Sequence, residues 1–305
     1  MAHEQTATLA QPAGVETDDV IAVDGLTFTY PKAVEPAVRG IDFAVRRGEI
    51  FGFLGPSGAG KSTTQKILTG LLTGYGGSVA IWGSQPADWG ADFYERIGVS
   101  FELPNHYQKL TGLENLQFFA SLYRGPTEDP MDLLDQVGLA EAAHVRVGKY
   151  SKGMQMRLVF VRALLHRPEL LFLDEPTSGM DPANARMIKD IIRQLRNDGS
   201  TVFLTTHDMT VADQLCDRVA FVVDGRIAAL DSPTELEVSR SRRVVRVTYR
   251  TATGHDLSTS EFPLDGLADD EEFFTLLRTH EVATLHSQEA DLEDVFLEVT
   301  GRSLS

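Results

Sequence analysis

The chain has 305 residues, enough for one large or two modest domains, and no run in it approaches the roughly twenty apolar residues that cross a bilayer. Its 44 acidic and 28 basic residues give a net charge of -16, which argues against a nucleic-acid-binding face, because such faces gather Lys and Arg against phosphates. The single cysteine, Cys216, excludes an intrachain disulfide and favours the reducing cytosol.

The first part of the chain changes from an aperiodic to an alternating pattern. Residues 1–19 are polar and rich in Ala, and we predict a disordered tail there. Residues 1–6 also lack the basic and apolar regions of a secretory signal. From Ile21 to Val45 apolar and polar residues alternate, which predicts antiparallel strands.

The segment from Gly55 to Ser62, GPSGAGKS, matches the phosphate-binding pattern G-x-x-x-x-G-K-[ST]. It follows an apolar run at 50–54 that suits a buried strand and precedes a helical stretch, which is the context that the pattern requires. In such a P-loop the backbone N–H groups face a phosphate, Lys61 reaches the β- and γ-oxygens, and the Ser62 hydroxyl ligates Mg²⁺. We therefore predict a bound nucleotide rather than an ordinary glycine-rich turn.

Between the P-loop and the next apolar run, most of the chain has helical character. Helices are predicted at 113–123, 131–137 and 155–166, so we interpret residues of about 92–166 as a helical subdomain. Ser151 is a good N-cap for the third helix, whose free N–H groups and positive dipole end would then point outward.

Two later apolar runs end in polar residues. The run at 170–173 is followed by Asp174 and Glu175, the run at 201–206 is followed by His207, and both suit buried parallel strands. Ligands of open α/β sheets bind outside the carboxyl ends of the strands, so these residues and the P-loop are expected to converge. Asp174 suits the Mg²⁺ position and Glu175 a general base. The alternatives are a turn-capping residue for Glu175 and a structural histidine for His207.

The remaining sequence predicts a hairpin and a small second unit. Residues 219–230, with Asp224-Gly225 at the turn, are predicted as a hairpin that closes the core domain. A small α+β unit is predicted for 240–305, with its elements in the order strand at 245–249, helix at 271–279, strand at 281–286 and helix at 292–299.

With these motifs, the chain resembles the ATP-binding subunits of ABC transporters over about residues 20–235. Tyr30 matches the aromatic residue that stacks on adenine in that family, with a core or edge-strand aromatic as the alternative. Residues 151–155, SKGMQ, match the signature motif, and residues 178–181, SGMD, match the loop after the second nucleotide motif. Glu102 lies where the family carries a glutamine that senses Mg²⁺ and faces the membrane partner.

The resemblance implies an α/β fold with a P-loop NTPase core. This core would have a mixed, mostly parallel sheet, an antiparallel β subdomain and a helical insertion, followed by the small α+β C-terminal unit. Residues 20–235 would form the ATP-binding domain and 240–305 the second domain. The implied ligands are ATP and Mg²⁺, held between two subunits so that each signature motif faces the γ-phosphate on the other copy.

The resemblance and the motifs together give a set of predicted site residues. The nucleotide is expected to contact residues of every motif, namely Tyr30, Gly55, Pro56, Ser57, Gly58, Ala59, Gly60, Lys61, Ser62, Thr63, Glu102, Ser151, Gly153, Met154 and Asp181. The predicted catalytic residues are Lys61, Glu175 and His207, the last as the γ-phosphate switch histidine. The predicted metal ligands are Ser62, Glu102 and Asp174.

The sequence departs from the family pattern at three of these positions. Lys152 and Met154 replace a common glycine and a common glutamine, while the Ser151 hydroxyl and the Gly153 backbone keep the contacts expected to matter most. Glu102 retains an oxygen ligand and adds a negative charge near Mg²⁺. That charge would either tighten metal binding or shift the coupling to the membrane partner.

The C-terminal residues 292–302 are similar to the ends of ATPase subunits from the drug and antibiotic exporter branch, the ABC-2 type that resembles daunorubicin-resistance proteins. We therefore predict an ATP-hydrolysing subunit that energises such an exporter through a separate integral membrane permease. It would act as a homodimer, peripheral at the cytoplasmic face of the cell membrane. The alternatives are an importer ATPase and a soluble ABC-type ATPase acting on ribosomes or DNA; the acidic charge counts against the latter.

Overall fold

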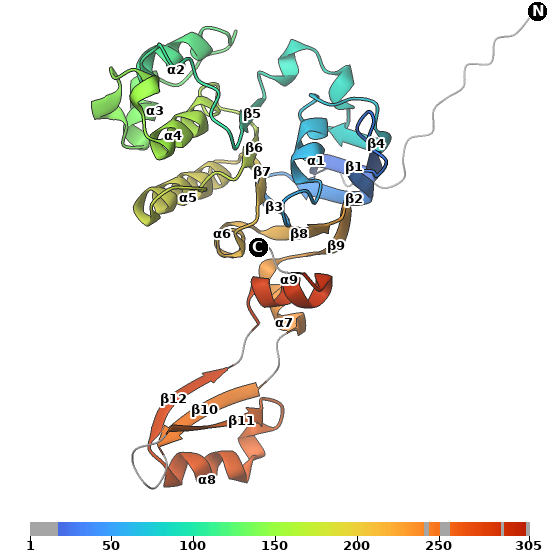
Figure 1. Cartoon of the computed structure of the whole chain (residues 1–305), viewed down its shortest axis with the longest axis vertical. Helices are drawn as coiled ribbons and strands as arrows, with labels where there is room; N and C mark the ends of the chain where they lie inside the picture. The colour runs from blue at the N-terminus through green and yellow to red at the C-terminus, as the bar shows by residue number, and fades with distance from the viewer. Residues whose placement is uncertain (1–17, 241–243, 251–256, 288–289, 303–305) are drawn as a thin grey trace, which may run out of the picture. The chain divides into compact units, whose positions relative to one another are not determined.

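The computed structural model describes residues 18–240, 244–250, 257–287 and 290–302 (Figure 1). These residues divide into two compact units, unit 1 up to Leu230 and unit 2 from Asp231. Most of the tail predicted for residues 1–19 lies outside the described residues, and Asp19 already begins a strand.

A six-stranded sheet forms the centre of unit 1, in the order β5-β6-β7-β3-β8-β9. Its strands are β3 (Ile50–Leu54), β5 (Ile97–Ser100), β6 (Leu170–Asp174), β7 (Thr201–Thr206), β8 (Arg218–Val223) and β9 (Arg226–Asp231). From β5 to β8 the neighbouring strands run parallel, and every residue of β3, β6 and β7 is buried. Burial on both faces explains their continuously apolar sequences, and the predicted mixed, mostly parallel sheet is confirmed.

A second, antiparallel sheet of unit 1 has the order β2-β1-β4. Its strands are β1 (Asp19–Phe28), β2 (Val38–Arg46) and β4 (Gly76–Ile81). Phe43 of β2 stacks on Phe51 of β3 with the ring centroids 5.6 Å apart, and it also lies 6.1 Å from the ring of Phe203 on β7. This aromatic contact joins the two sheets into one core. The antiparallel pairing of β1 and β2 confirms the strands that the alternating pattern at 21–45 predicts.

Side chains cap the N-termini of the α-helices of unit 1 after the first, whereas the first has Gly60 at its N-cap position and no side-chain cap. They are α1 (Lys61–Leu68), α2 (Gly112–Ala120), α3 (Pro130–Gln136), α4 (Lys152–Arg162), α5 (Pro182–Asn197) and α6 (Met209–Leu215). Thr111 and Glu114 form a reciprocal capping box at α2, and Ser151 caps α4 by accepting a hydrogen bond from Met154 N. Helices α2, α3 and α4 gather away from the antiparallel sheet, as a separate helical subdomain (Figure 1).

The range predicted as helical, 92–166, also contains a strand of the main sheet. Strand β5 pairs parallel with β6, so Ile97 lies opposite Leu170. Its four residues are too few to show a periodic pattern, and single 3₁₀ turns at 86–88 and 91–93 precede it. The helical part of the insertion therefore begins only at Gly112.

Unit 2 combines a three-stranded antiparallel sheet with helices. Its elements are α7 (Pro233–Arg240), β10 (Val244–Arg250), β11 (Leu257–Pro263), α8 (Glu271–Thr279), β12 (Val282–Ser287) and α9 (Leu292–Thr300). The sheet has the order β11-β10-β12, and its core packs Val245, Val247 and Phe262 against Phe273 and Leu276 of α8. Among the helices of the described ranges, none combines the length and hydropathy of a membrane span.

Candidate functional site

The P-loop leaves β3 at Leu54 and enters α1 at Lys61. Gly58 and Gly60 have φ angles of 82° and 107°, in the region that favours glycine. At Gly60 a Cβ atom would lie 2.6 Å from the carbonyl oxygen of Ala37, so a side chain has no room there. The glycines therefore let the loop fold tightly at the N-terminus of α1, whose first N–H groups have no partner within the helix.

Lys61 points back across the loop that it ends. Its ammonium group donates to the carbonyl oxygen of Gly55 at 2.6 Å and to that of Pro56 at 3.1 Å. Burial lowers the pKa of Lys61, and the nearby carboxylates of Glu175, Asp174 and Glu102 oppose this shift. Lys61 is therefore a buried cation that lines the cleft beside three carboxylates, and its ammonium group can donate to a phosphate oxygen.

Asp174 is the last residue of β6 and lies opposite Thr205 in the parallel pair β6–β7. The Thr205 hydroxyl donates a hydrogen bond to its carboxylate. Burial raises the pKa of Asp174, the Thr205 hydrogen bond lowers it, and the charges of Glu102 and Glu175 raise it further. Burial and the neighbouring negative charges destabilise the ionised form of Asp174, and a cation bound beside it would stabilise that form.

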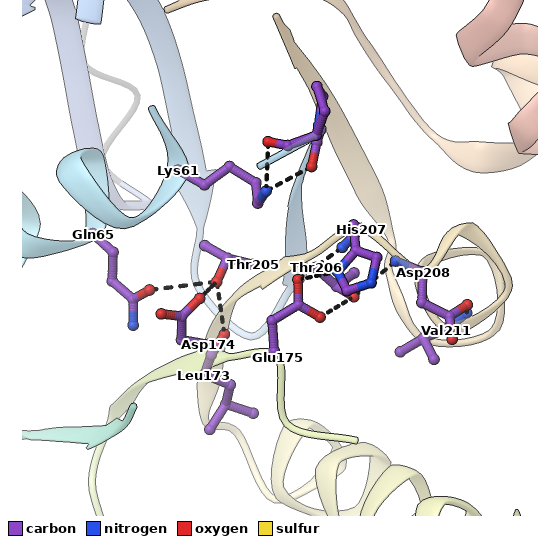
Figure 2. A network of polar contacts seen from close by, with 12 residues as sticks. Lys61, Gln65, Leu173, Asp174, Glu175, Thr205, Thr206, His207, Asp208 and Val211 are labelled. Carbon is purple, nitrogen blue, oxygen red and sulfur yellow. Dashed lines mark hydrogen bonds and ion pairs between the residues drawn. The ribbon is translucent and has the colours of Figure 1, made fainter. Parts of the chain in front are cut away.

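Glu175 and His207 form a close pair at the ends of β6 and β7 (Figure 2). Glu175 Oε1 accepts hydrogen bonds from His207 N at 3.0 Å and from His207 Nδ1 at 2.6 Å. Glu175 has a φ of 50°, which turns its side chain toward the end of β7 instead of continuing the strand. Bonding through Nδ1 leaves the Nε2 atom of His207 for another partner.

A cleft of about 450 Å³ joins these segments on one edge of the main sheet. Residues from the P-loop, the ends of β6 and β7 and the antiparallel side line it, namely Tyr30, Ala37, Ser57, Gly58, Gly60, Lys61, Ser62, Thr63, Glu102, Asp174, Glu175 and His207. The structure thus brings together stretches that lie far apart in the sequence. Gly55, Pro56 and Ala59 do not line the cleft but belong to the backbone of the loop beside it.

Tyr30 forms one wall of the cleft. Its hydroxyl lies 3.1 Å from Thr63 Oγ1, and its ring packs edge-on against Phe28. Because 38% of Tyr30 is exposed, one face of its ring is accessible, and a flat ligand ring can stack on it.

The signature residues Ser151, Gly153 and Met154, and also Asp181, do not line this cleft. The Ser151 side chain caps α4 at 3.2 Å from Met154 N, and the Asp181 side chain caps α5. Within one chain Ser151 and Asp181 therefore act as helix caps, and Gly153 and Met154 lie in the first turn of α4.

The donor set of the cleft fits a nucleotide with a magnesium ion. The P-loop offers backbone N–H groups and an ammonium to phosphates, while Ser62, Asp174 and Glu102 offer only oxygen atoms, the ligand type that Mg²⁺ prefers. In the part of the chain that the structure describes, no three His, Cys, Asp or Glu side chains gather as a metal site. This suits an ion that takes one or two protein carboxylates and completes its shell with phosphates and water.

Sequence reasoning missed Thr205, Thr206 and Ala37. Ala37 lines the cleft, and the two threonines hydrogen-bond to Asp174 and Glu175. The available signal was the pair of threonines that follows the apolar residues 202–204 in the strand TVFLTT, because a buried hydroxyl needs a partner.

Comparison with known proteins agrees with this geometry. The family model "ABC transporter" matches residues 38–178, and the model "Fluoroquinolone efflux ABC transporter C-terminal domain" matches residues 243–289. A solved ATP-binding cassette, a dimer in a post-hydrolysis state with bound ADP and Pi, is 27% identical with a TM-score of 0.63. It aligns over 70% of this chain and 98% of its own.

Two curated relatives align over nearly the whole chain. A fluoroquinolones export ATP-binding protein of Mycobacterium tuberculosis is 70% identical over 94% of this chain and 95% of its own length. The daunorubicin/doxorubicin resistance ATP-binding protein of Streptomyces peucetius is 34% identical, over 87% of this chain and 88% of its own. The α/β P-loop fold, the cleft and these relatives lead to one conclusion: the chain belongs to the family of ABC transporter ATP-binding subunits.

Proposed function

We propose that this chain hydrolyses ATP to drive the export of a drug, of the fluoroquinolone type, through a separate membrane subunit. The observation that carries the proposal is the single cleft in which the P-loop meets Asp174, Glu175 and His207. The names of the two relatives support the choice of a drug exporter, as does the match of residues 243–289 to a fluoroquinolone efflux domain. The protein would act at the cytoplasmic face of the membrane.

The cleft residues divide into those that hold the nucleotide and those that hold its metal. The P-loop N–H groups and Lys61 would bind the phosphates, and Tyr30 would stack on the adenine. Ser62, Asp174 and Glu102 would hold Mg²⁺, which when bound neutralises charge on the phosphate oxygens. Replacing the family's glutamine with Glu102 keeps an oxygen ligand at that place.

Glu175 would orient the attacking water and take its proton. Its side chain is nearly buried, with 10% exposed, yet it lines the cleft beside the ends of β6 and β7. As the water attacks the γ-phosphorus, negative charge grows on the transferred group and on the leaving oxygen. Lys61 and the P-loop N–H groups would stabilise that charge without reorganising.

A second copy of the chain would complete each site. Ser151, Gly153 and Met154 at the N-terminus of α4 would face the γ-phosphate bound to the other copy, where N–H groups and the helix dipole favour an anion. Asp181, the N-cap of α5, would lie at the same junction between the two copies.

The membrane subunit would dock beside Glu102 on the helical subdomain. Exposed apolar side chains gather there: 74% of Leu103 and 51% of Tyr107 are exposed, and Tyr107 packs on Phe118, itself 40% exposed. Apolar side chains left in solvent mark a surface that another protein covers.

The catalytic part of the proposal is tested with Glu175→Gln. We expect ATP binding within about twofold of wild type and hydrolysis slower by roughly a hundredfold or more, because the amide cannot accept the water proton. Phosphate release and binding of a fluorescent ATP analogue measure the two quantities. Wild-type turnover in Glu175→Gln would remove Glu175 from the role of general base.

The transport part needs the membrane partner. Pull-down of the tagged chain from solubilised membranes identifies the co-purifying integral protein, and both are then placed in inside-out vesicles. We expect ATP-dependent accumulation of a fluoroquinolone, and none with the Glu175→Gln variant. Uptake in the opposite direction would indicate an importer, and co-purification with ribosomes or DNA instead of a membrane protein would contradict transport.

A further inference from the structure

Two consecutive threonines at the end of β7 each hold one carboxylate of the cleft (Figure 2). The Thr205 hydroxyl donates to Asp174, and the Thr206 hydroxyl donates to Glu175 Oε2 at 3.0 Å. Both threonines are buried, with at most 1% of their surface exposed. Because neighbouring residues of a strand point to opposite faces, one hydroxyl serves each carboxylate and neither can serve both.

The hydrogen bonds of Glu175 leave its two oxygens unequal. Oε1 accepts from both His207 N and His207 Nδ1, which uses its two lone pairs. Oε2 accepts from Thr206 alone among the residues that the structure describes. The remaining lone pair of the carboxylate is therefore on Oε2, the oxygen that Thr206 holds.

The Thr206 hydroxyl is itself fixed from the other side. Its oxygen accepts from Asp208 N at 3.0 Å, so its proton is directed to Glu175 and not to another acceptor. Asp208 in turn caps α6 through Val211 N at 3.0 Å. A continuous series of hydrogen bonds thus runs from the first turn of α6 through Thr206 to the carboxylate, as Figure 2 shows.

We propose that Thr206 is the positioning residue that aims the free lone pair of Glu175 Oε2 at the attacking water. This inference rests on the proposed ATP hydrolysis. The water oxygen bonds to the γ-phosphorus, the bond from that phosphorus to the bridging oxygen breaks with its electron pair going to ADP, and the water proton passes to Oε2. Without the Thr206 hydroxyl, Glu175 keeps only its bonds to His207 and rotates about them, so Oε2 loses its direction.

The test compares Thr206→Val, which has the shape of threonine without the hydroxyl, with Thr206→Ser, which keeps the hydroxyl. Losing one hydrogen bond to a charged group is expected to lower kcat for ATP by about tenfold. The KM for ATP and the Kd of a fluorescent ATP analogue should stay within about twofold, since no phosphate contact changes. Thr206→Ser should restore kcat to within about threefold of wild type.

A double variant separates positioning from a merely structural role. Because Thr206 acts through Glu175, adding Thr206→Val to Glu175→Gln should slow hydrolysis no further. An unchanged kcat in Thr206→Val, a matching loss of ATP binding, or no recovery in Thr206→Ser would each overturn the inference. If Thr206→Val does not fold, Thr206→Cys, whose thiol is a weak donor, replaces it with the same expected result.

The Glu175→Gln single variant keeps the two proposals apart. If Glu175→Gln hydrolyses ATP like wild type, the proposed catalytic role of Glu175 fails and this inference fails with it. If Glu175→Gln is inactive while Thr206→Val turns over like wild type, only the positioning role of Thr206 fails.

Discussion

Glu175 holds a backbone conformation that costs energy. A residue with a side chain at a φ of 50° is strained by roughly 1–3 kcal/mol and persists only where its surroundings fix it. Here three hydrogen bonds to the carboxylate, from Thr206 and His207, supply that fixation. Strain and hydrogen bonding therefore meet at the residue that the proposed chemistry needs in one orientation.

The surroundings of His106 favour one protonation state. Its Nε2 lies 3.0 Å from the Gln155 carbonyl oxygen, so that nitrogen carries the proton. Its Nδ1 is buried and has no partner among the residues that the structure describes. Burial, with a further contribution from the charge of Arg162, lowers the pKa of His106 from 6.5 to about 4, although the bond to Gln155 opposes this.

The pKa of His106 predicts a loss of stability in acid. Between pH 6.5 and 4 the unfolded chain binds a proton at this residue that the folded chain does not, so the free energy of unfolding falls as the pH is lowered through that window. Between pH 7 and pH 5, His106 alone should lower the free energy of unfolding by about 2 kcal/mol. Urea unfolding at both pH values measures it.

The control is His106→Gln, whose side-chain amide keeps a donor for the Gln155 carbonyl oxygen and does not titrate. This variant should lose about 2 kcal/mol less than wild type between pH 7 and pH 5. His144→Gln, a change of an exposed histidine, should behave like wild type. Equal losses in wild type and His106→Gln would contradict the assignment.

At the scale of elements, strand order explains why so much of the site was predictable. The P-loop follows β3, Asp174 ends β6 and His207 follows β7, and these strands are neighbours in a parallel sheet. Parallel strands place their carboxyl ends on one edge, so buried runs followed by polar residues were enough to predict the convergence. The caps at Ser151 and the bounds of α8 also followed from local sequence.

Other elements left no readable signal. Strand β5 has only four residues. Strand β11, LSTSEFP, alternates in exposure but has polar side chains at most of its less exposed positions, so its sequence shows no apolar alternation. The hydrogen bonds of Glu175 to Thr206 and His207 form with Glu175 at a positive φ, and the sequence does not predict a positive φ for a glutamate. The contacts proposed for the signature lie between chains and cannot follow from the geometry of one.

Helix α4 allows the cap at Ser151 to be separated from its proposed phosphate contact. Ser151→Asp and Ser151→Asn both keep an acceptor for Met154 N, so each should unfold within about 0.5 kcal/mol of wild type, whereas Ser151→Ala should lose about 1 kcal/mol. Only Ser151→Asp places a negative charge opposite a phosphate, and its ATPase rate should fall by roughly a hundredfold.

Unfolding in urea and phosphate release check the two effects. Ser151→Asn is the matched neutral control and should retain clearly more activity than Ser151→Asp. If the two variants are equally active, the N-terminus of α4 does not face the γ-phosphate, and Ser151 acts only as a helix cap.

At the scale of the whole molecule, the net charge opposes self-association. Each copy carries -16, so two copies repel one another, and something must outweigh that repulsion for a dimer to form. In the proposed arrangement, each ATP bridges the P-loop of one copy and the α4 N-terminus of the other. The nucleotide would then form part of the dimer interface as well as being the substrate that is hydrolysed.

Glu175→Gln should therefore dimerise only when ATP and Mg²⁺ are added, because it binds ATP but does not hydrolyse it and so remains closed. Light scattering after size exclusion should give the mass of one chain without nucleotide and of two chains with it. Adding Lys61→Ala, which loses phosphate binding, or Ser151→Asp, which repels the phosphate, should each restore the single-chain mass. A Glu175→Gln sample that keeps the mass of one chain at saturating ATP would contradict a nucleotide-bridged homodimer, and the second subunit would then have to be a different ATP-binding chain. A sample with the mass of two chains in the absence of ATP would also contradict it.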